Sequence, residues 1–342
     1  MATLVMLLAL GAGVVVWQLA FDDDRSELEL AVAMAPDDAA RFSWTDWAGV
    51  RSELGLDLDA TSSPEDVQRL LDLGFEADLT STTALRESTL VMHDQLGFSA
   101  ASIDWELFSQ GASGASVLMG AGDVDLDAVA DRLRALGYEE PGSETGPWIS
   151  DSEVDAITAE VTPELTFIVL DADAGLIVSS DSQRGIDAAV EAADADESAQ
   201  LSDGVLAAVE GALTAALYTG DTACGELAMG NADPTEQAEG EALVAQAGDI
   251  NPVTGFAIAA VPGGEVRVAL SFESAEQART NADTRAVLAS GPAPGQGGDF
   301  ADRFTLGDVT ADDNVVTLEL EPVEGSYVLS DLSTGPVLFA TC

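Results

Sequence analysis

Lysine is absent from this 342-residue sequence, and its twelve basic residues are all arginine. The sequence also contains 62 aspartates and glutamates, so its formal net charge is -50 at pH 7. A polyanion of this size is repelled by nucleic-acid phosphates and by anionic lipid headgroups, and it attracts divalent ions and basic proteins. The composition therefore argues against nucleic-acid binding, and it predicts that added salt stabilises the fold by screening self-repulsion.

Histidine and cysteine are also scarce. A serine or cysteine triad would need the single histidine, His93, beside an activated nucleophile. No G-x-S-x-G motif is present, and the Gly-Ala-Ser-Gly at 111–114 is typical of a turn. One histidine and two distant cysteines cannot build a usual zinc site. We therefore assign no catalytic, cofactor-binding or metal-binding residue, and we expect His93 to have a packing or surface role.

Carboxylates are so numerous that no apparent pair is meaningful, and acid–base chemistry of the glycosidase kind has no positive evidence. Residues 123–127 and 171–175 place aspartates at alternate positions, as calcium loops do. A calcium loop that starts at Asp171 would have its glycine one position early and Ser182 at position twelve. We expect a hairpin turn at 171–175 and an acidic helix N-terminus at 123–127, with weak divalent-cation binding as the alternative.

One long apolar run, residues 3–20, opens the sequence, and Gln18 is its only strongly polar member. Its 18 residues are near the minimum for a membrane-spanning helix. The cleavage-like Ala33-Met34-Ala35 lies too far downstream for a signal peptidase site. We expect an uncleaved, single-pass transmembrane anchor over residues 1–20, with a cleaved signal as the alternative, and a juxtamembrane segment over 21–40. The body would then be extracytoplasmic, at the cell membrane.

The two cysteines are Cys224 and Cys342, and Cys342 is the last residue. An even number of cysteines beside an export segment favours a disulfide between them. Such a bond would prevent the C-terminus from fraying. It would also close a loop of more than a hundred residues, which is worth about 4–5 kcal/mol in the chain-entropy model.

The hydrophobic pattern predicts an α+β fold of antiparallel hairpins backed by amphipathic helices. Four hairpins are expected, at about 103–119, 165–178, 256–272 and 304–320. Their clean alternation predicts that one face of each hairpin is solvated and the other is covered. Capping signals predict further helices, over 64–74, 234–247 and 275–289, with Ser63, Asp233 and Ser274 as their N-caps.

Three further segments have local signals. Alternating apolar residues predict a strand within 25–37, with a juxtamembrane helix as the alternative. A second strand is expected over 41–47, before a short helix at 47–54, where Trp44 and Trp47 are expected to pack in the core. The segment 290–298 has too few apolar residues to order itself, which predicts a flexible loop.

The recurrence of hairpin and helix indicates an internal duplication into two lobes. Lobe 1 is residues 41–200 and lobe 2 is residues 201–342. The repeat is one of pattern, because residue identity between the units is weak. A cleft between two such lobes would be the natural ligand site.

Three short stretches combine aromatic residues with serine, threonine and aspartate in a lysine-free, aspartate-rich chain. They are 43–47 (Ser-Trp-Thr-Asp-Trp), 217–221 (Leu-Tyr-Thr-Gly-Asp) and 326–331 (Ser-Tyr-Val-Leu-Ser-Asp). In this composition the chain resembles the uncharacterised exported proteins of halophilic archaea. The resemblance implies no activity, cofactor or site residue. The expected function is binding or scaffolding at the cell envelope by a membrane-anchored protein. A carboxylate-dependent envelope hydrolase and a calcium-dependent adhesion module are the alternatives.

Overall fold

The computed structural model describes residues 25–143, 146–150, 161–195 and 201–342. The expected transmembrane anchor over residues 1–20 lies outside these ranges. Within them, no helix is both long and apolar enough to cross a membrane.

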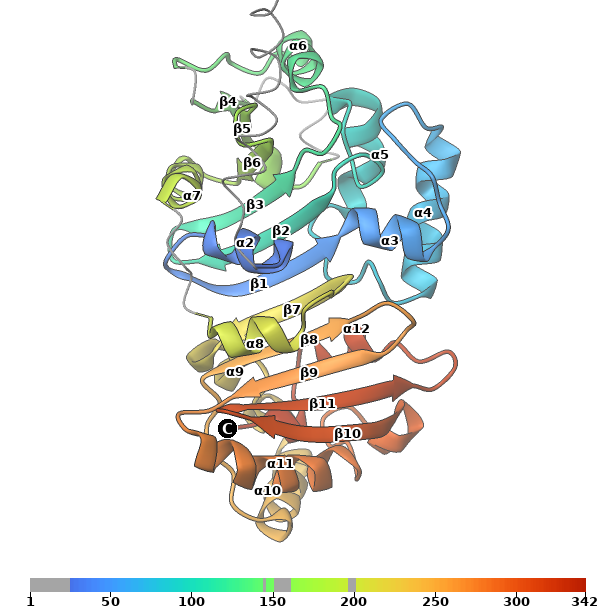
Figure 1. Cartoon of the computed structure of the whole chain (residues 1–342), viewed down its shortest axis with the longest axis vertical. Helices are drawn as coiled ribbons and strands as arrows, with labels where there is room; N and C mark the ends of the chain where they lie inside the picture. The colour runs from blue at the N-terminus through green and yellow to red at the C-terminus, as the bar shows by residue number, and fades with distance from the viewer. Residues whose placement is uncertain (1–24, 144–145, 151–160, 196–200) are drawn as a thin grey trace, which may run out of the picture.

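The described residues form an α+β fold around one antiparallel sheet (Figure 1). Its eleven strands are ordered β10-β11-β9-β8-β7-β1-β2-β3-β6-β5-β4. In chain order the strands are β1 Ala39–Asp46, β2 Trp105–Gly111, β3 Gly114–Gly120, β4 Trp148–Ile149, β5 Phe167–Asp171, β6 Leu176–Ser180, β7 Thr214–Thr219, β8 Gly255–Ala260, β9 Val266–Ser271, β10 Phe304–Asp312 and β11 Val315–Pro322. The α-helices are α2 Glu27–Ala33, α3 Trp47–Glu53, α4 Pro64–Glu76, α5 Thr89–Val91, α6 Leu126–Leu136, α7 Gln183–Ala195, α8 Asp203–Ala208, α9 Gly220–Glu226, α10 Pro234–Ala247, α11 Ala275–Ala289 and α12 Val328–Leu332.

One strand order occurs twice in this sheet. Outward from the central pair of β1 and β7, the first half runs β1-β2-β3-β6-β5 and the second runs β7-β8-β9-β11-β10. Ser43 of β1 pairs with Ala216 of β7, and each of these residues lies three positions before the end of its strand. The single sheet therefore continues across the expected boundary between residues 200 and 201.

The two faces of the sheet bury separate cores. The larger core lies under helices of both halves, and Trp47, Leu70, Leu133, Leu288 and Leu329 belong to it. The smaller core lies under α2, α7 and α8. Figure 1 shows α2 and α8 in front of the strands. The expectation of one solvated face is therefore wrong for the central strands, because helices and loops cover both of their faces.

The four hairpins and most helices lie where the sequence predicts them. The N-caps Ser63, Asp233 and Ser274 are confirmed, and each side chain accepts a hydrogen bond from a backbone N–H of its helix. Gly74 does not end α4, which continues to Glu76. Gly74 is needed for packing, because a Cβ there would lie 2.5 Å from Thr80 Cγ2.

Within residues 25–37, Glu27–Ala33 form helix α2, so the predicted strand is wrong and a helix forms, as the alternative expected. Ser26 accepts a hydrogen bond from Glu29 N, and Glu29 Oε2 accepts one from Ser26 N at 2.7 Å. This capping box satisfies backbone groups that a helix start leaves unpaired. Leu28, Ala31 and Val32, at helical spacing, are buried on the sheet.

Residues 290–298 also differ from the expected flexible loop. Arg303 donates hydrogen bonds to the carbonyl oxygens of Gln296 at 2.7 Å and Gly297 at 3.0 Å. Gln296 donates to Asp331 O at 2.9 Å, and Ala293 is buried. The loop is thus held by Arg303 from outside it and by its own Gln296 and Ala293, through tertiary contacts that its composition does not reveal.

Candidate functional site

His93 has the expected packing role. It is buried, with Nε2 2.8 Å from Ser62 O and Nδ1 3.2 Å from Ser99 Oγ. Both ring nitrogens therefore bond to the loops around the helical turn that carries the histidine. Trp44 and Trp47 are also buried, as predicted. The Trp44 ring stacks on the Trp105 ring, with 5.6 Å between the ring centroids.

The two aspartate stretches have structural roles. Asp171 Oδ1 accepts hydrogen bonds from the backbone N–H groups of Asp173 and Ala174, which closes the β5–β6 turn. Asp125 accepts one from Ala128 N and caps α6. Across the described ranges, no group of three histidine, cysteine, aspartate or glutamate side chains is placed to hold a metal ion.

Glu106 on β2 is a fully buried carboxylate, and burial raises its pKa. Its oxygens accept hydrogen bonds from Trp47 Nε1 at 3.0 Å, Thr83 Oγ1 at 2.6 Å and Ala84 N at 2.8 Å. These donors come from α3 and from the loop between α4 and α5. Glu106 thus ties this loop to the sheet, and a structural role accounts for its bonds.

A second group of carboxylates lies where β1 ends and β2 begins. Burial raises the pKa of Asp46, of Asp104 and of Glu27, and Asp104 adds to this rise at the other two through charge repulsion. Asp46 is the N-cap of α3 and accepts from Gly49 N at 2.7 Å. The Arg51 guanidinium partly offsets the repulsion at Asp46 and Asp104. It also donates to Ala100 O and Ile103 O.

A hollow that we call the junction pocket lies where residues of the two expected lobes meet. Its volume is about 140 Å³. Residues 41–200 contribute Glu53, Glu76, Ala77, Asp78 and Leu79, and residues 201–342 contribute Leu213, Ala260, Val261, Gly264, Val266, Pro322, Ser326 and Val328. The pocket thus has carboxylates from one half and mainly apolar walls from the other.

Asp78 is the buried carboxylate of the junction pocket lining. It adopts a left-handed backbone conformation with φ 57°, which aspartate tolerates better than most residues. Its Oδ2 accepts hydrogen bonds from Leu329 N at 2.8 Å and Ser330 N at 3.2 Å, and its Oδ1 accepts one from the Ser330 hydroxyl. The carboxylate thereby binds the first turn of α12 to the end of α4. Burial raises the pKa of Asp78.

Two exposed hydrophobic residues are next in sequence to residues that line the same pocket. Phe75, next to Glu76, is 42% exposed, and Val323, next to Pro322, is 41% exposed. The Phe75 ring packs against Tyr327 at 5.5 Å, and the Arg86 guanidinium lies 4.5 Å from its centroid. In the described part of the chain, Val287 is the remaining large hydrophobic side chain with comparable exposure.

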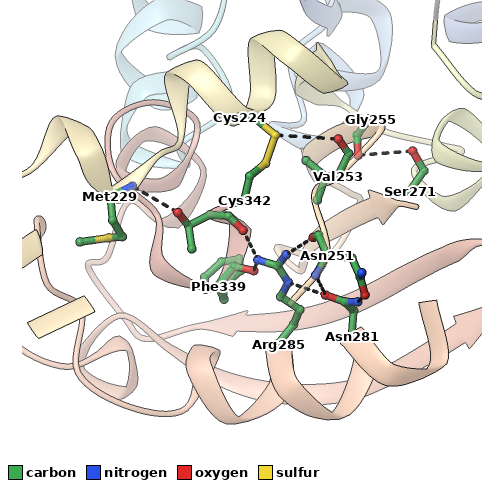
Figure 2. The surroundings of a disulfide bond; sticks show 11 residues. Cys224, Met229, Asn251, Val253, Gly255, Ser271, Asn281, Arg285, Phe339 and Cys342 are labelled. Atoms are coloured by element: carbon green, nitrogen blue, oxygen red, sulfur yellow. Dashed lines mark hydrogen bonds between the residues drawn. A yellow bond between two sulfur atoms is a disulfide. The ribbon is translucent and has the colours of Figure 1, made fainter. Parts of the chain in front are cut away.

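The C-terminal segment is held by a disulfide and by a buried arginine (Figure 2). Cys224 is bonded to Cys342, with the Cα atoms 5.4 Å apart. Arg285 of α11 donates to Phe339 O at 2.9 Å, Thr341 O at 2.5 Å and Asn251 O at 2.8 Å. Burial lowers the pKa of Arg285 to about 10. The site stabilises the end of the chain.

No protein-family model and no curated protein matches this chain. Two crystal structures of TP0453 are similar in shape. Crystal form I has 10% sequence identity and a TM-score of 0.42, covering 89% of this chain and 96% of that chain. Crystal form III has 9% identity and a TM-score of 0.43, covering 88% and 97%. Likeness at this level assigns no function.

Sequence reasoning places a ligand site between the lobes in general terms, but it identifies none of the pocket residues. Glu53 and Glu76 resemble any other acidic residue at the end of a helix. The pocket forms only when α3 and α4 pack beside β8, β9 and α12, so no local pattern signals it.

Proposed function

We propose that this chain is an exported protein, anchored in the membrane by residues 3–20, whose acidic body binds or scaffolds a protein partner outside the cytoplasm. The disulfide between Cys224 and Cys342 supports this placement, because such bonds form and persist in oxidising compartments. The net charge of -50 supports a solvent-exposed body whose surface attracts cationic partners.

The junction pocket is the observation that carries the binding role. Pockets for drug-sized ligands are about 300–1,000 Å³. At about 140 Å³, this one is suited to a single side chain instead. Protein interfaces commonly place one anchor side chain in such a pocket and surround it with apolar contacts.

Exposed hydrophobic residues that are next in sequence to the pocket lining support the same interpretation. Aromatic residues are enriched at protein interfaces. Phe75 packs against Tyr327, and both are next in sequence to residues that line the pocket. A solvent-facing phenylalanine costs free energy in isolation, and its burial by a partner would recover that cost. A protein ligand therefore fits this surface better than a small metabolite does.

The repeated strand order supports a duplicated origin for lobe 1, residues 41–200, and lobe 2, residues 201–342. In this proposal the two lobes share one sheet and meet at the junction pocket. A long sheet that is continuous across both halves gives a rigid base, which a scaffold needs.

Site-specific photocrosslinking in intact cells tests the proposal. Phe75→p-benzoylphenylalanine is expected to give one covalent adduct with a cell-envelope protein on irradiation. Val287→p-benzoylphenylalanine is the matched control, because Val287 is 58% exposed but lies on α11, away from the pocket lining. No adduct from position 75, or the same adduct from both positions, would contradict the proposal.

A further inference from the structure

We propose that the junction pocket takes one basic side chain of the partner, a lysine or an arginine. The inference rests on the proposed function and names the chemistry of its anchor. The carboxylates Glu53, Glu76 and Asp78 line the pocket, and no arginine or histidine does. A cation in the pocket is attracted by these carboxylates, and this attraction is screened by salt because Glu53 and Glu76 are exposed.

The oxygen atoms of the three carboxylates differ in how many hydrogen bonds they already accept. Asp78 is committed to the first turn of α12 through both of its oxygens. Glu53 Oε1 accepts from Gly263 N at 3.1 Å, which leaves Oε2 without a partner in the described part of the chain. Glu76 is exposed and has no hydrogen bond or ion pair with any described residue. Two glutamates can therefore bond an incoming ammonium or guanidinium group.

The apolar walls suit the aliphatic stem of such a side chain. Lysine and arginine bury their methylene groups along apolar surface while the charged end seeks polar partners. In the pocket, this surface comes from the apolar residues Leu79, Leu213, Ala260, Val261, Val266 and Val328. A hydrated inorganic ion would gain nothing from these walls.

The lack of a metal-binding group among the described carboxylates also favours an organic cation over a metal ion. Metal sites bring three or more ligand atoms to about 2.0–2.6 Å from one point. The described carboxylates, those of the pocket included, form no such group. A guanidinium or ammonium group can bond carboxylates that are further apart, because each N–H reaches its own acceptor.

Peptide binding to the full-length chain in detergent tests the inference. The probes are three fluorescent pentapeptides with blocked ends, Gly-Ser-X-Ser-Gly, in which X is lysine, arginine or norleucine. Norleucine keeps the aliphatic stem and removes the charge. At constant ionic strength, fluorescence anisotropy is expected to give at least about tenfold tighter binding for the charged peptides than for norleucine, since charge-assisted bonds are the stronger class.

Two double variants with the same change in net charge give the control. Glu53→Gln/Glu76→Gln is expected to abolish the preference for the charged peptides. Glu239→Gln/Glu241→Gln, on the exposed side of α10, is expected to retain it. Equal binding of the lysine and norleucine peptides, or equal loss of preference in both variants, would overturn the inference. If the Phe75 adduct still forms in that case, the proposed protein-binding function stands and only the basic anchor is refuted.

Discussion

At the scale of single residues, buried charged groups join segments that are far apart in the sequence. Glu106, Asp78 and Arg285 are each buried, and their hydrogen-bond partners in the described part of the chain are uncharged. Asp78 and Arg285 bond mainly to backbone groups, and Glu106 bonds to two side chains and one backbone N–H. In the sequence, Glu106 is the polar residue of an alternating strand, which normally indicates solvent exposure. It is buried because the loop between α4 and α5 covers it, and the strand pattern does not reveal that tertiary contact.

Glu106 is expected to make the fold more stable at acidic pH. Its pKa is raised in the folded state, so the folded protein favours the protonated carboxyl. The contribution of Glu106 to the free energy of unfolding is fully present below its unfolded-state pKa, and it is lost as the pH rises through its folded-state pKa. Glu106→Gln removes the titration, so its melting temperature should change less than that of the wild type between pH 7.5 and pH 4.5, at constant ionic strength.

Glu210→Gln is a suitable control for this measurement, because Glu210 is exposed and should leave the wild-type pH dependence intact. Glu106→Ala should instead cost about 1–3 kcal/mol, since it leaves Trp47 Nε1 buried without an acceptor. If the melting temperatures of the wild type and of Glu106→Gln change equally with pH, the pKa of Glu106 does not differ between the folded and unfolded states.

At the scale of elements, the best predictions rest on local chemistry. The helices capped by Ser63, Asp233 and Ser274 were predictable because a cap and its first turn lie within four residues. Helix α2 was harder, because its seven residues satisfy both a strand period and a helix period. The residues that line the junction pocket could not be predicted, since they are spread through the sequence from Glu53 to Val328.

The C-terminal segment is expected to have two independent restraints, the disulfide and Arg285. In the chain-entropy model, Cys224→Ser/Cys342→Ser should lower the free energy of unfolding by about 4–5 kcal/mol, because the bond closes a separation of 118 residues. Arg285 should still hold the carbonyl groups of Phe339 and Thr341 in that variant. Carboxypeptidase digestion followed by mass spectrometry should therefore find its C-terminus protected.

Adding Arg285→Lys to the disulfide-free variant should expose the C-terminus to carboxypeptidase. Lysine lacks the planar set of donors that reaches Asn251, Phe339 and Thr341 together. A cooperative melt of this variant would show that the core is intact. Digestion of the disulfide-free variant alone would refute the role assigned to Arg285.

At the scale of the whole molecule, the charge and the packing of the chain have opposite effects on the stability of the fold. The single sheet and its two cores hold the chain together, while 62 acidic residues repel one another. Twelve arginines cannot neutralise them, and some arginines are committed to backbone carbonyls, as Arg51 and Arg285 are. The excess negative charge is thus a property of the surface, and it acts on stability through the solvent.

Stability should therefore follow ionic strength and not the identity of the cation. Raising NaCl from 0.1 M to 1 M shortens the Debye length from about 10 Å to about 3 Å, which removes most repulsion between exposed carboxylates. The melting temperature of the full-length chain in detergent should rise over this range, with EDTA present throughout. Calcium chloride at matched ionic strength, without EDTA, should give the same rise, because the described residues hold no cluster that could bind a metal ion. A larger rise with calcium would reveal a specific cation site and favour calcium-dependent adhesion, since a ligand that binds only the folded state stabilises it by mass action.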